Sequence, residues 1–143
     1  MARLSPHRDK ITLGVQALVT DTARRVLLVK HGYRPGWHFP GGGVEHAESV
    51  RLALARELEE EAGIVLDAPA HIFGIYSHFD AFPGDHIVLF VAISWTRIRV
   101  PEPNREIAEH GFFTLDALPE GTTPQTRRRI DEVFLGRPKA ETW

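Results

Sequence analysis

The sequence predicts an α/β fold in which helices flank a mixed β-sheet. Segments rich in β-branched and aliphatic residues alternate with strong helix formers, in the order strands, helix, strands, helix. The chain has 143 residues, of which 43% are hydrophobic and 25% are charged, as expected of one globular domain with a sizeable core. We therefore expect a single domain over residues 1–143, with an ordered core from about residue 10 to about residue 136.

The first half of the chain predicts two strands, a structured loop and a helix. Residues 11–21 and 25–32 have the aliphatic and β-branched content of strands. The next segment is rich in proline and glycine, which predicts a loop with a short extended core at residues 37–39. Strong helix formers then run from Ser49 to Gly63, and this glycine stands where a helix is expected to end.

The second half begins with a predicted hairpin. Residues 71–80 and 86–100 have the composition of strands, and Pro83, Gly84 and Asp85 between them favour a turn. The two strands are therefore expected to lie side by side.

A short strand and a second helix are predicted near the end of the chain. Residues 101–110 form an acidic loop with prolines, which leads into a strand at residues 111–115. Thr123 and Pro124 suit the N-cap and the first position of a helix. This helix carries an apolar stripe made of Ile130, Val133 and Phe134. Because that stripe needs a surface to pack on, the helix is expected to cover the sheet.

Composition and charge exclude several classes of function. The net charge of −2 and the pI of about 6.4 favour neither nucleic-acid nor membrane binding. The absence of cysteine excludes disulfides, thiolate metal sites and a cysteine nucleophile, and it fits a reducing compartment. The start of the chain, MARLSPHRDK, has no apolar segment, and no apolar run is long enough to span a bilayer. We expect a cytoplasmic protein without a nucleic-acid or membrane partner.

The first predicted helix carries an unusually acidic run, RELEEEAG. At about 100° per residue, Glu57, Glu60 and Glu61 lie together at the border of the buried face, and Glu59 points roughly the opposite way. Carboxylates that close together repel one another and should have raised pKa values until a cation compensates them. Such oxygen ligands suit Mg²⁺ or Mn²⁺. Judged by this run alone, a solvated acidic face is the more common alternative.

The residues upstream of the run favour the metal site. The chain from Gly42 onward reads GGVEHAESVRLALARELEEEAGI, which matches the Nudix box, G-x5-E-x7-R-E-U-x-E-E-x-G-U with U aliphatic. Every fixed position is filled, namely by Gly42, Glu48, Arg56, Glu57, Leu58, Glu60, Glu61, Gly63 and Ile64. The chain therefore resembles a Nudix hydrolase, and the preceding WHFPGG and the strand order extend the resemblance over the whole domain.

The resemblance implies a fold and a reaction. The fold would be the Nudix α/β/α sandwich, a mixed β-sheet flanked by helices, with a loop-helix-loop metal site. Nudix enzymes hydrolyse a pyrophosphate bond in a nucleoside diphosphate linked to another group, with a divalent metal that the box glutamates bind. By position these ligands are Glu57, Glu60 and Glu61, and the carbonyl of Gly41 often joins them. Glu48 and Arg56 would orient the ligands, since an arginine beside several carboxylates can bridge them.

The general base is left open by the resemblance, because family members use either a box glutamate or one from a later loop. Inside the box the candidates are Glu60 and Glu61. Outside it they are Glu106 and Glu109, with Glu102 as a weaker third, because this acidic loop precedes a strand that could bring it over the metal. Each loop glutamate also fits an ordinary solvated position.

Several residues just before the box are candidates for binding the substrate. Lys30 and Arg34 could contact its phosphates, and Tyr33 and Trp37 could stack on its base. The same residues also fit strand-end charges and core aromatics, so both interpretations stay open.

The substrate is predicted only by elimination. The second signatures expected after the box for ADP-ribose, dinucleoside polyphosphate, NADH and coenzyme A enzymes are absent or displaced, which favours a nucleoside or deoxynucleoside triphosphate cleaved to the monophosphate and pyrophosphate. The alternatives are an ADP-ribose, nucleotide-sugar or dinucleoside polyphosphate hydrolase, an RNA 5′-end hydrolase, and a nucleotide-sensing module without turnover. A homodimer is expected only because related proteins often form one.

Overall fold

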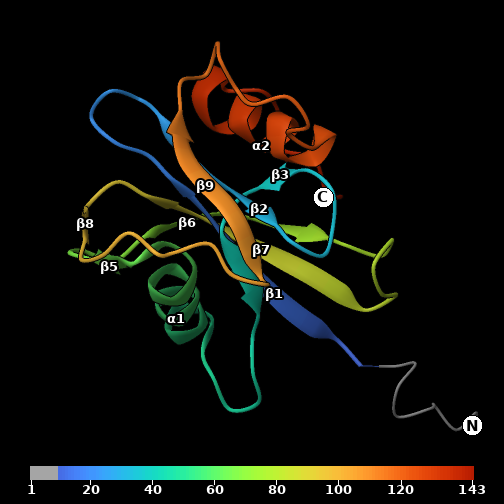
Figure 1. The fold of residues 1–143 in the computed structure, drawn as a ribbon. Helices are drawn as coiled ribbons and strands as arrows, with labels where there is room; N and C mark the ends of the chain where they lie inside the picture. Colours follow the sequence, from blue (N-terminus) through green and yellow to red (C-terminus); the bar gives the residue numbers. More distant parts are fainter. Residues whose placement is uncertain (1–9) are drawn as a thin grey trace, which may run out of the picture.

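The computed structural model describes residues 10–143, so the predicted domain start at Met1 and the N-terminal sequence around it lie outside the described part (Figure 1). The elements in chain order are β1 (Thr12–Val19), β2 (Val26–His31), β3 (Trp37–His38), β4 (Gly41–Gly43), α1 (Val50–Ala62), β5 (Ile64–Leu66), β6 (His71–Ser77), β7 (Asp85–Ala92), β8 (Trp95–Arg97), β9 (Ile107–Phe113) and α2 (Pro124–Leu135). Within this part of the chain, no helix has the length and apolar character that a membrane crossing needs.

The strands form a mixed α/β architecture, which confirms the predicted fold class. The largest sheet has the order β4-β1-β7-β6, and it is mixed because β1 and β7 run parallel while its other pairs are antiparallel. Figure 1 shows α1 and α2 on opposite sides of the strands. One detail differs from the prediction: the strands form three hydrogen-bonded sheets instead of one, because β3-β2-β9 and β5-β8 pair separately.

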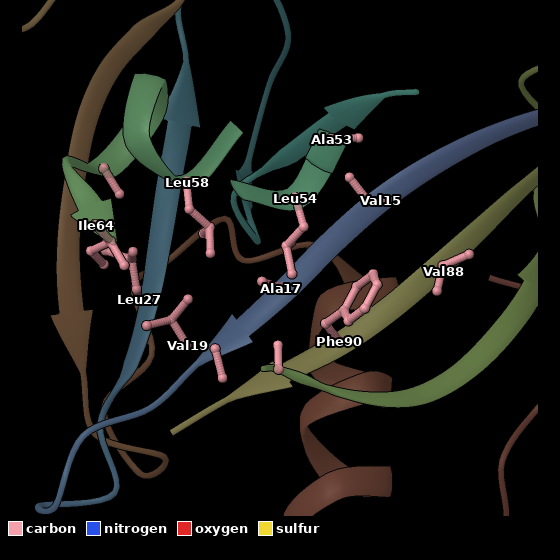
Figure 2. Close-up of a cluster of buried hydrophobic side chains, with 13 residues drawn as sticks. Val15, Ala17, Val19, Leu27, Ala53, Leu54, Leu58, Ile64, Val88 and Phe90 are labelled. Atoms are coloured by element: carbon pink, nitrogen blue, oxygen red, sulfur yellow. The ribbon is translucent and has the colours of Figure 1, made fainter. Parts of the chain in front are cut away.

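The packing of α1 fixes which way its glutamates point. Figure 2 shows Leu54 and Leu58 pointing from α1 toward the strands, into a cluster with Ala17 and Phe90. Both leucines are almost fully buried, and burial of each contributes about 2 kcal/mol. Rotating the helix would expose them, so the carboxylates next to this face keep their direction.

The ends of α1 agree with the prediction. Ser49 is the N-cap, and its side chain accepts a hydrogen bond from the N–H of Leu52 at 3.1 Å. Gly63 ends the helix in the left-handed conformation with φ of 65°, and a side chain there would collide with the main chain of Arg99.

Three predicted boundaries were wrong, each because of pairing between distant segments. The strand expected at 86–100 is split, since β8 leaves the path of β7 and pairs with β5, which was not predicted. β4 was expected to be loop, yet it pairs with β1. The strand expected at 111–115 is β9, which begins at Ile107 and therefore takes Glu109 out of the acidic loop.

The packed part of the chain extends past residue 136, where the predicted core ended. The main-chain N–H of Trp143 donates to the carbonyl of Ser77 at 2.9 Å, and the Trp143 side chain is only 9% exposed. Its ring packs edge-on against Tyr76 and Phe39, with centroids 5.5 and 6.3 Å away. The last residue thus belongs to the cluster on the α2 side of the strands.

Replacing Trp143 with alanine is expected to destabilise the protein by about 3 kcal/mol, because a large buried aromatic leaves a cavity when truncated. Urea unfolding measures the change. Leu135→Ala is the matched control, since this α2 residue is 63% exposed and its loss should change stability by less than about 1 kcal/mol. Equal effects of the two substitutions would contradict the packing role of Trp143.

Candidate active site

Three carboxylates from two distant segments meet beside α1. Glu57 and Glu61 lie one turn apart on α1 and are 7% and 3% exposed, and Glu106 comes from the loop before β9. One oxygen of each lies within 4.8 Å of the others. The donor set consists of hard oxygen ligands, which fits Mg²⁺ or Mn²⁺.

The pairing of β2 with β9 brings Glu106 to this place. The N–H of Gly32, just after β2, donates to the main-chain carbonyl of Glu106 at 3.0 Å. The side-chain oxygen of Asn104 accepts from the N–H groups of Glu106 and Ile107, both at 2.9 Å. These bonds hold the loop in one conformation, so the position of Glu106 is set by its main chain.

Burial makes the charged form of these acids unfavourable. It raises the pKa of Glu61 to about 8, and the nearby Glu57 and Glu106 add to the rise, although the N–H of Gly41 donates to the Glu61 carboxylate at 3.0 Å. Burial also raises the pKa of Glu57, against the opposing effect of Arg56. A divalent cation would remove this penalty, which is the behaviour expected of metal ligands.

Arg56 forms hydrogen bonds with several residues of the box. Its Nε and Nη2 donate to the two oxygens of Glu48 at 2.8 and 2.9 Å, and Nη1 donates to Glu57 Oε1 at 2.7 Å. Nη2 also donates to the carbonyl of Gly43 at 3.0 Å. The hydrogen bonds from Arg56 hold the pKa of Glu48 down at about 2. These hydrogen bonds restrain the Glu57 carboxylate, and the role of Arg56 and Glu48 in orienting metal ligands stays a prediction.

The glycine that opens the box lies against Glu57. A side chain on Gly42 would displace the Glu57 carboxylate, so glycine at this position leaves room for the carboxylate where the structure has it. The neighbouring Gly41 would likewise collide with the main chain of β1 if it carried a side chain. Gly41 contacts the carboxylate group through its N–H; a metal bond from its carbonyl stays a prediction.

Other predicted glutamates lie outside the three-carboxylate group. The Glu60 side chain is 61% exposed at the solvent edge of α1, 3.7 Å from Nη1 of Arg56. Glu109 pairs with Lys30 across β9 and β2, also at 3.7 Å, and both are largely exposed. Glu102 lies exposed in the loop before Asn104.

Some of the residues predicted to bind the substrate lie near the carboxylate group, and others do not. Lys30 follows Leu28 on the strand face that belongs to the α2-side cluster, and Trp37 packs edge-on against Phe113 in that cluster, with centroids 5.2 Å apart. Tyr33 lies nearer the carboxylates: burial raises its pKa, and the charges of Glu106 and Glu61 raise it further. The structure therefore places Tyr33 near the carboxylate group and Lys30 and Trp37 on the α2 side of the strands.

The buried side chain of His31 forms hydrogen bonds with Tyr33 and Arg34. The Nδ1 atom of His31 lies 2.9 Å from the hydroxyl of Tyr33, and the Nε of Arg34 donates to it at 3.2 Å. Burial lowers the pKa of His31 to about 4, and the charge of Arg34 and the nearby His38 contribute. His31 is therefore neutral near pH 7, with Nδ1 as the acceptor for both neighbours.

The lowered pKa of His31 predicts acid sensitivity. In the unfolded chain His31 takes up a proton below about pH 6.5, whereas the folded protein resists it until about pH 4, so stability is full above pH 6.5 and is lost as the pH falls. The free energy of unfolding should drop by about 2 kcal/mol more between pH 7 and pH 5 in wild type than in His31→Gln. Urea unfolding at both pH values measures this, and His71→Gln, which changes an exposed histidine, should behave as wild type. Parallel curves for wild type and His31→Gln would contradict the assignment.

A cleft of about 310 Å³ is lined by Gly41, Gly42 and Gly43 of β4, and it adjoins the carboxylate group through Gly41, whose N–H donates to Glu61. Arg34, Phe39, β4 and the first residues of β1 contribute to its walls. Residues that the sequence did not single out lie along it, namely Thr12, Gln16, His78, Asp85 and Ile87. Asp85 was interpreted only as a turn residue before a predicted strand, and its place beside Thr12 of β1 is evident only from the pairing of β1 with β7.

Comparison with known proteins gives one consistent class. A model of the NUDIX domain matches residues 10–134. An RNA pyrophosphohydrolase of Teredinibacter turnerae is 28% identical over 143 residues, covering 94% of this chain and 70% of that protein. An ADP-ribose pyrophosphatase of Methanocaldococcus jannaschii is 30% identical over 105 residues, covering 71% and 62%. The crystal structure of a MutT NUDIX hydrolase from Burkholderia pseudomallei is 34% identical, covers 87% of this chain and 99% of that one, and gives a TM-score of 0.71.

The fold, the box and these matches define a pyrophosphohydrolase. The chain belongs to the Nudix hydrolase family, as its box predicted. The names of the relatives refer to different substrates, and members of the family therefore act on more than one kind of nucleotide.

Proposed function

We propose that the protein hydrolyses a nucleoside or deoxynucleoside triphosphate to the monophosphate and pyrophosphate, with Mg²⁺ or Mn²⁺ as cofactor. The observation that carries this proposal is the group of Glu57, Glu61 and Glu106 beside a cleft of nucleoside size. The displaced or absent signatures for other Nudix substrates support the choice of a triphosphate.

The proposed roles follow the geometry. Glu57, Glu61 and Glu106 hold the metal, with Glu60 joining from the solvent edge and the Gly41 carbonyl as a further ligand. When bound, the metal neutralises phosphate charge and makes the phosphorus more open to attack by water.

The remaining groups orient the reactants. Arg56 keeps the Glu57 carboxylate in place, and Arg34 and Tyr33 bind phosphate oxygens by hydrogen bonds. Glu61 and Glu106 are the candidates for accepting the proton of the attacking water, because both lie within the carboxylate group.

A hydrolysis screen tests the proposal. Purified protein is incubated with nucleoside triphosphates, ADP-ribose, nucleotide sugars and dinucleoside polyphosphates, with Mg²⁺, with Mn²⁺ and with a chelator, and the products are identified. Release of pyrophosphate and monophosphate, lost with the chelator, is the expected result. Tight nucleotide binding without turnover of any compound would instead indicate a sensing module.

An RNA 5′ end is the second candidate substrate. The T. turnerae relative bears the name RNA pyrophosphohydrolase, whereas the chain's net charge of −2 favours no nucleic-acid partner. Adding an oligonucleotide with a 5′-triphosphate to the screen decides between the two, since faster cleavage of the oligonucleotide than of free triphosphates would overturn the first proposal. The cytoplasmic location and the homodimer stay predictions.

A further inference from the structure

We propose that Asp85 selects the base of the substrate and favours guanine. This inference rests on the proposed function, because it concerns the nucleoside part of the molecule whose phosphates lie at the carboxylate group. It assigns a role to a side chain that lies in the cleft and takes no part in the metal site.

The cleft places Asp85 at a suitable distance from the phosphates. Gly41, which bonds Glu61, pairs with Gln16 of β1, and Asp85 pairs with Thr12 of the same strand. Gln16 and Thr12 are four residues, or about 13 Å, apart along β1, and Gly41 and Asp85 lie on opposite neighbours of that strand, about 10 Å apart across the sheet, so about 16 Å separates the two positions. An extended nucleoside with its first phosphates covers such a span, so phosphates at the Gly41 end put the base at the Asp85 end.

The walls of the cleft suit a planar base. The apolar residues Phe39 and Ile87 line the cleft from the core, where they are 1% and 3% exposed, and Gly14 leaves room above β1 because it has no side chain. Arg34 lines the same cleft and supplies the positive charge that the phosphates need. The cleft therefore combines apolar walls with a few placed polar groups, as small-molecule sites do.

Two neighbours hold the Asp85 carboxylate in one orientation. The hydroxyl of Thr12 donates to Oδ1 at 2.7 Å, and Nδ1 of His78 lies 3.0 Å from Oδ2. The side chain is about 20% exposed, so it is accessible from the cleft without being free to rotate. Each oxygen keeps a further lone pair for a ligand.

A carboxylate held in this way accepts hydrogen bonds and cannot donate them. Guanine presents two adjacent donors, N1–H and the N2 amino group, which match the two carboxylate oxygens. Uracil and thymine present two carbonyl oxygens on either side of one N–H, and these oxygens would be repelled. Adenine and cytosine present one amino group beside an acceptor nitrogen and should fall between the two cases.

The test compares kcat/KM for GTP, ATP, CTP and UTP in wild type, Asp85→Asn and Asp80→Asn. Wild type should prefer GTP to UTP by tenfold to a hundredfold, the usual discrimination of a two-bond base contact. In Asp85→Asn the ratio of kcat/KM for GTP to that for UTP should fall at least tenfold. The asparagine amide has one donor and one acceptor, so it no longer accepts from both donors of guanine. Asp80→Asn is the matched control, since Asp80 is an exposed acid in the β6–β7 connection just before Asp85, and it should keep the wild-type ratio.

Binding of the products gives a second readout that does not depend on turnover. Calorimetry should show GMP binding to wild type at least tenfold more tightly than UMP, and Asp85→Asn should reduce that ratio. Absence of turnover together with this GMP preference would reject the proposed function and keep the role of Asp85. Turnover with equal kcat/KM for GTP and UTP, or an unchanged ratio in Asp85→Asn, would overturn the inference and leave the proposed function standing.

Thermal unfolding shows whether Asp85→Asn is folded. If it is not, Thr12→Val serves instead, because it removes the hydrogen bond to Oδ1 without removing the carboxylate. The GTP to UTP ratio should then fall severalfold, and an unchanged ratio in folded Thr12→Val would count against Asp85 as the base-reading group.

Discussion

Glu61→Gln is expected to lower kcat by two to three orders of magnitude while leaving the protein folded. The amide has the shape of the acid but lacks the negative charge that a metal site requires, and such losses reduce metal-dependent catalysis strongly. The fold should tolerate the change, because burial already favours the neutral form of Glu61 and the N–H of Gly41 can still donate to the amide oxygen. The measurement is steady-state hydrolysis at saturating Mg²⁺, with thermal unfolding alongside.

The other glutamates of α1 provide the comparison for Glu61. Glu59→Gln removes an equal charge from the exposed side of the same helix and should stay within about twofold of wild type. Glu60→Gln should weaken Mg²⁺ binding and be partly rescued by higher Mg²⁺, since Glu60 lies at the solvent edge of α1, outside the three-carboxylate group, and is proposed only as an additional ligand. Full activity in Glu61→Gln would remove Glu61 from the metal site.

The second large effect is expected from Glu106→Gln, which should lower kcat by about a hundredfold or more. One of its carboxylate oxygens lies within 4.8 Å of oxygens of Glu57 and Glu61, and the proposed roles for it are metal ligand and acceptor of the water proton. Glu109→Gln should have little effect, because Glu109 pairs with Lys30 at an exposed position of the β2–β9 ladder.

These two substitutions make a matched pair, since they change the same residue type three positions apart. The pH dependence of kcat distinguishes the two proposed roles of Glu106. If Glu106 accepts the proton, the substitution should remove the acidic side of the pH profile of kcat. If Glu106 is a metal ligand, the shape of the profile should stay the same while Mg²⁺ binds more weakly. A larger effect of Glu109→Gln than of Glu106→Gln would contradict the described arrangement of the loop.

Local sequence patterns predicted the elements that depend on neighbours along the chain. Helix periodicity put Glu57 and Glu61 on one side of α1, and the N-cap serine and C-terminal glycine marked its ends. The spacing of Glu48 and Arg56 in the box indicated the ion pair that the structure contains. These features depend only on the geometry of a helix and the loop before it, and the spacing of residues along the chain predicts that geometry.

The features that the patterns missed depend on which strands meet. Pairing of β2 with β9 brings Glu106 to α1 and holds Glu109 beside Lys30, although the two glutamates stand in the same acidic segment. Parallel pairing of β1 with β7 sets Asp85 beside Thr12.

Residue spacing therefore determined the family, the helix that carries the box glutamates and the class of bond that is hydrolysed. Tertiary structure decided which loop carboxylate joins the site and which side chains line the cleft. The physical reason is that a strand's partner is chosen by packing and hydrogen bonding across the whole sheet, and the sequence around any one strand does not contain that choice.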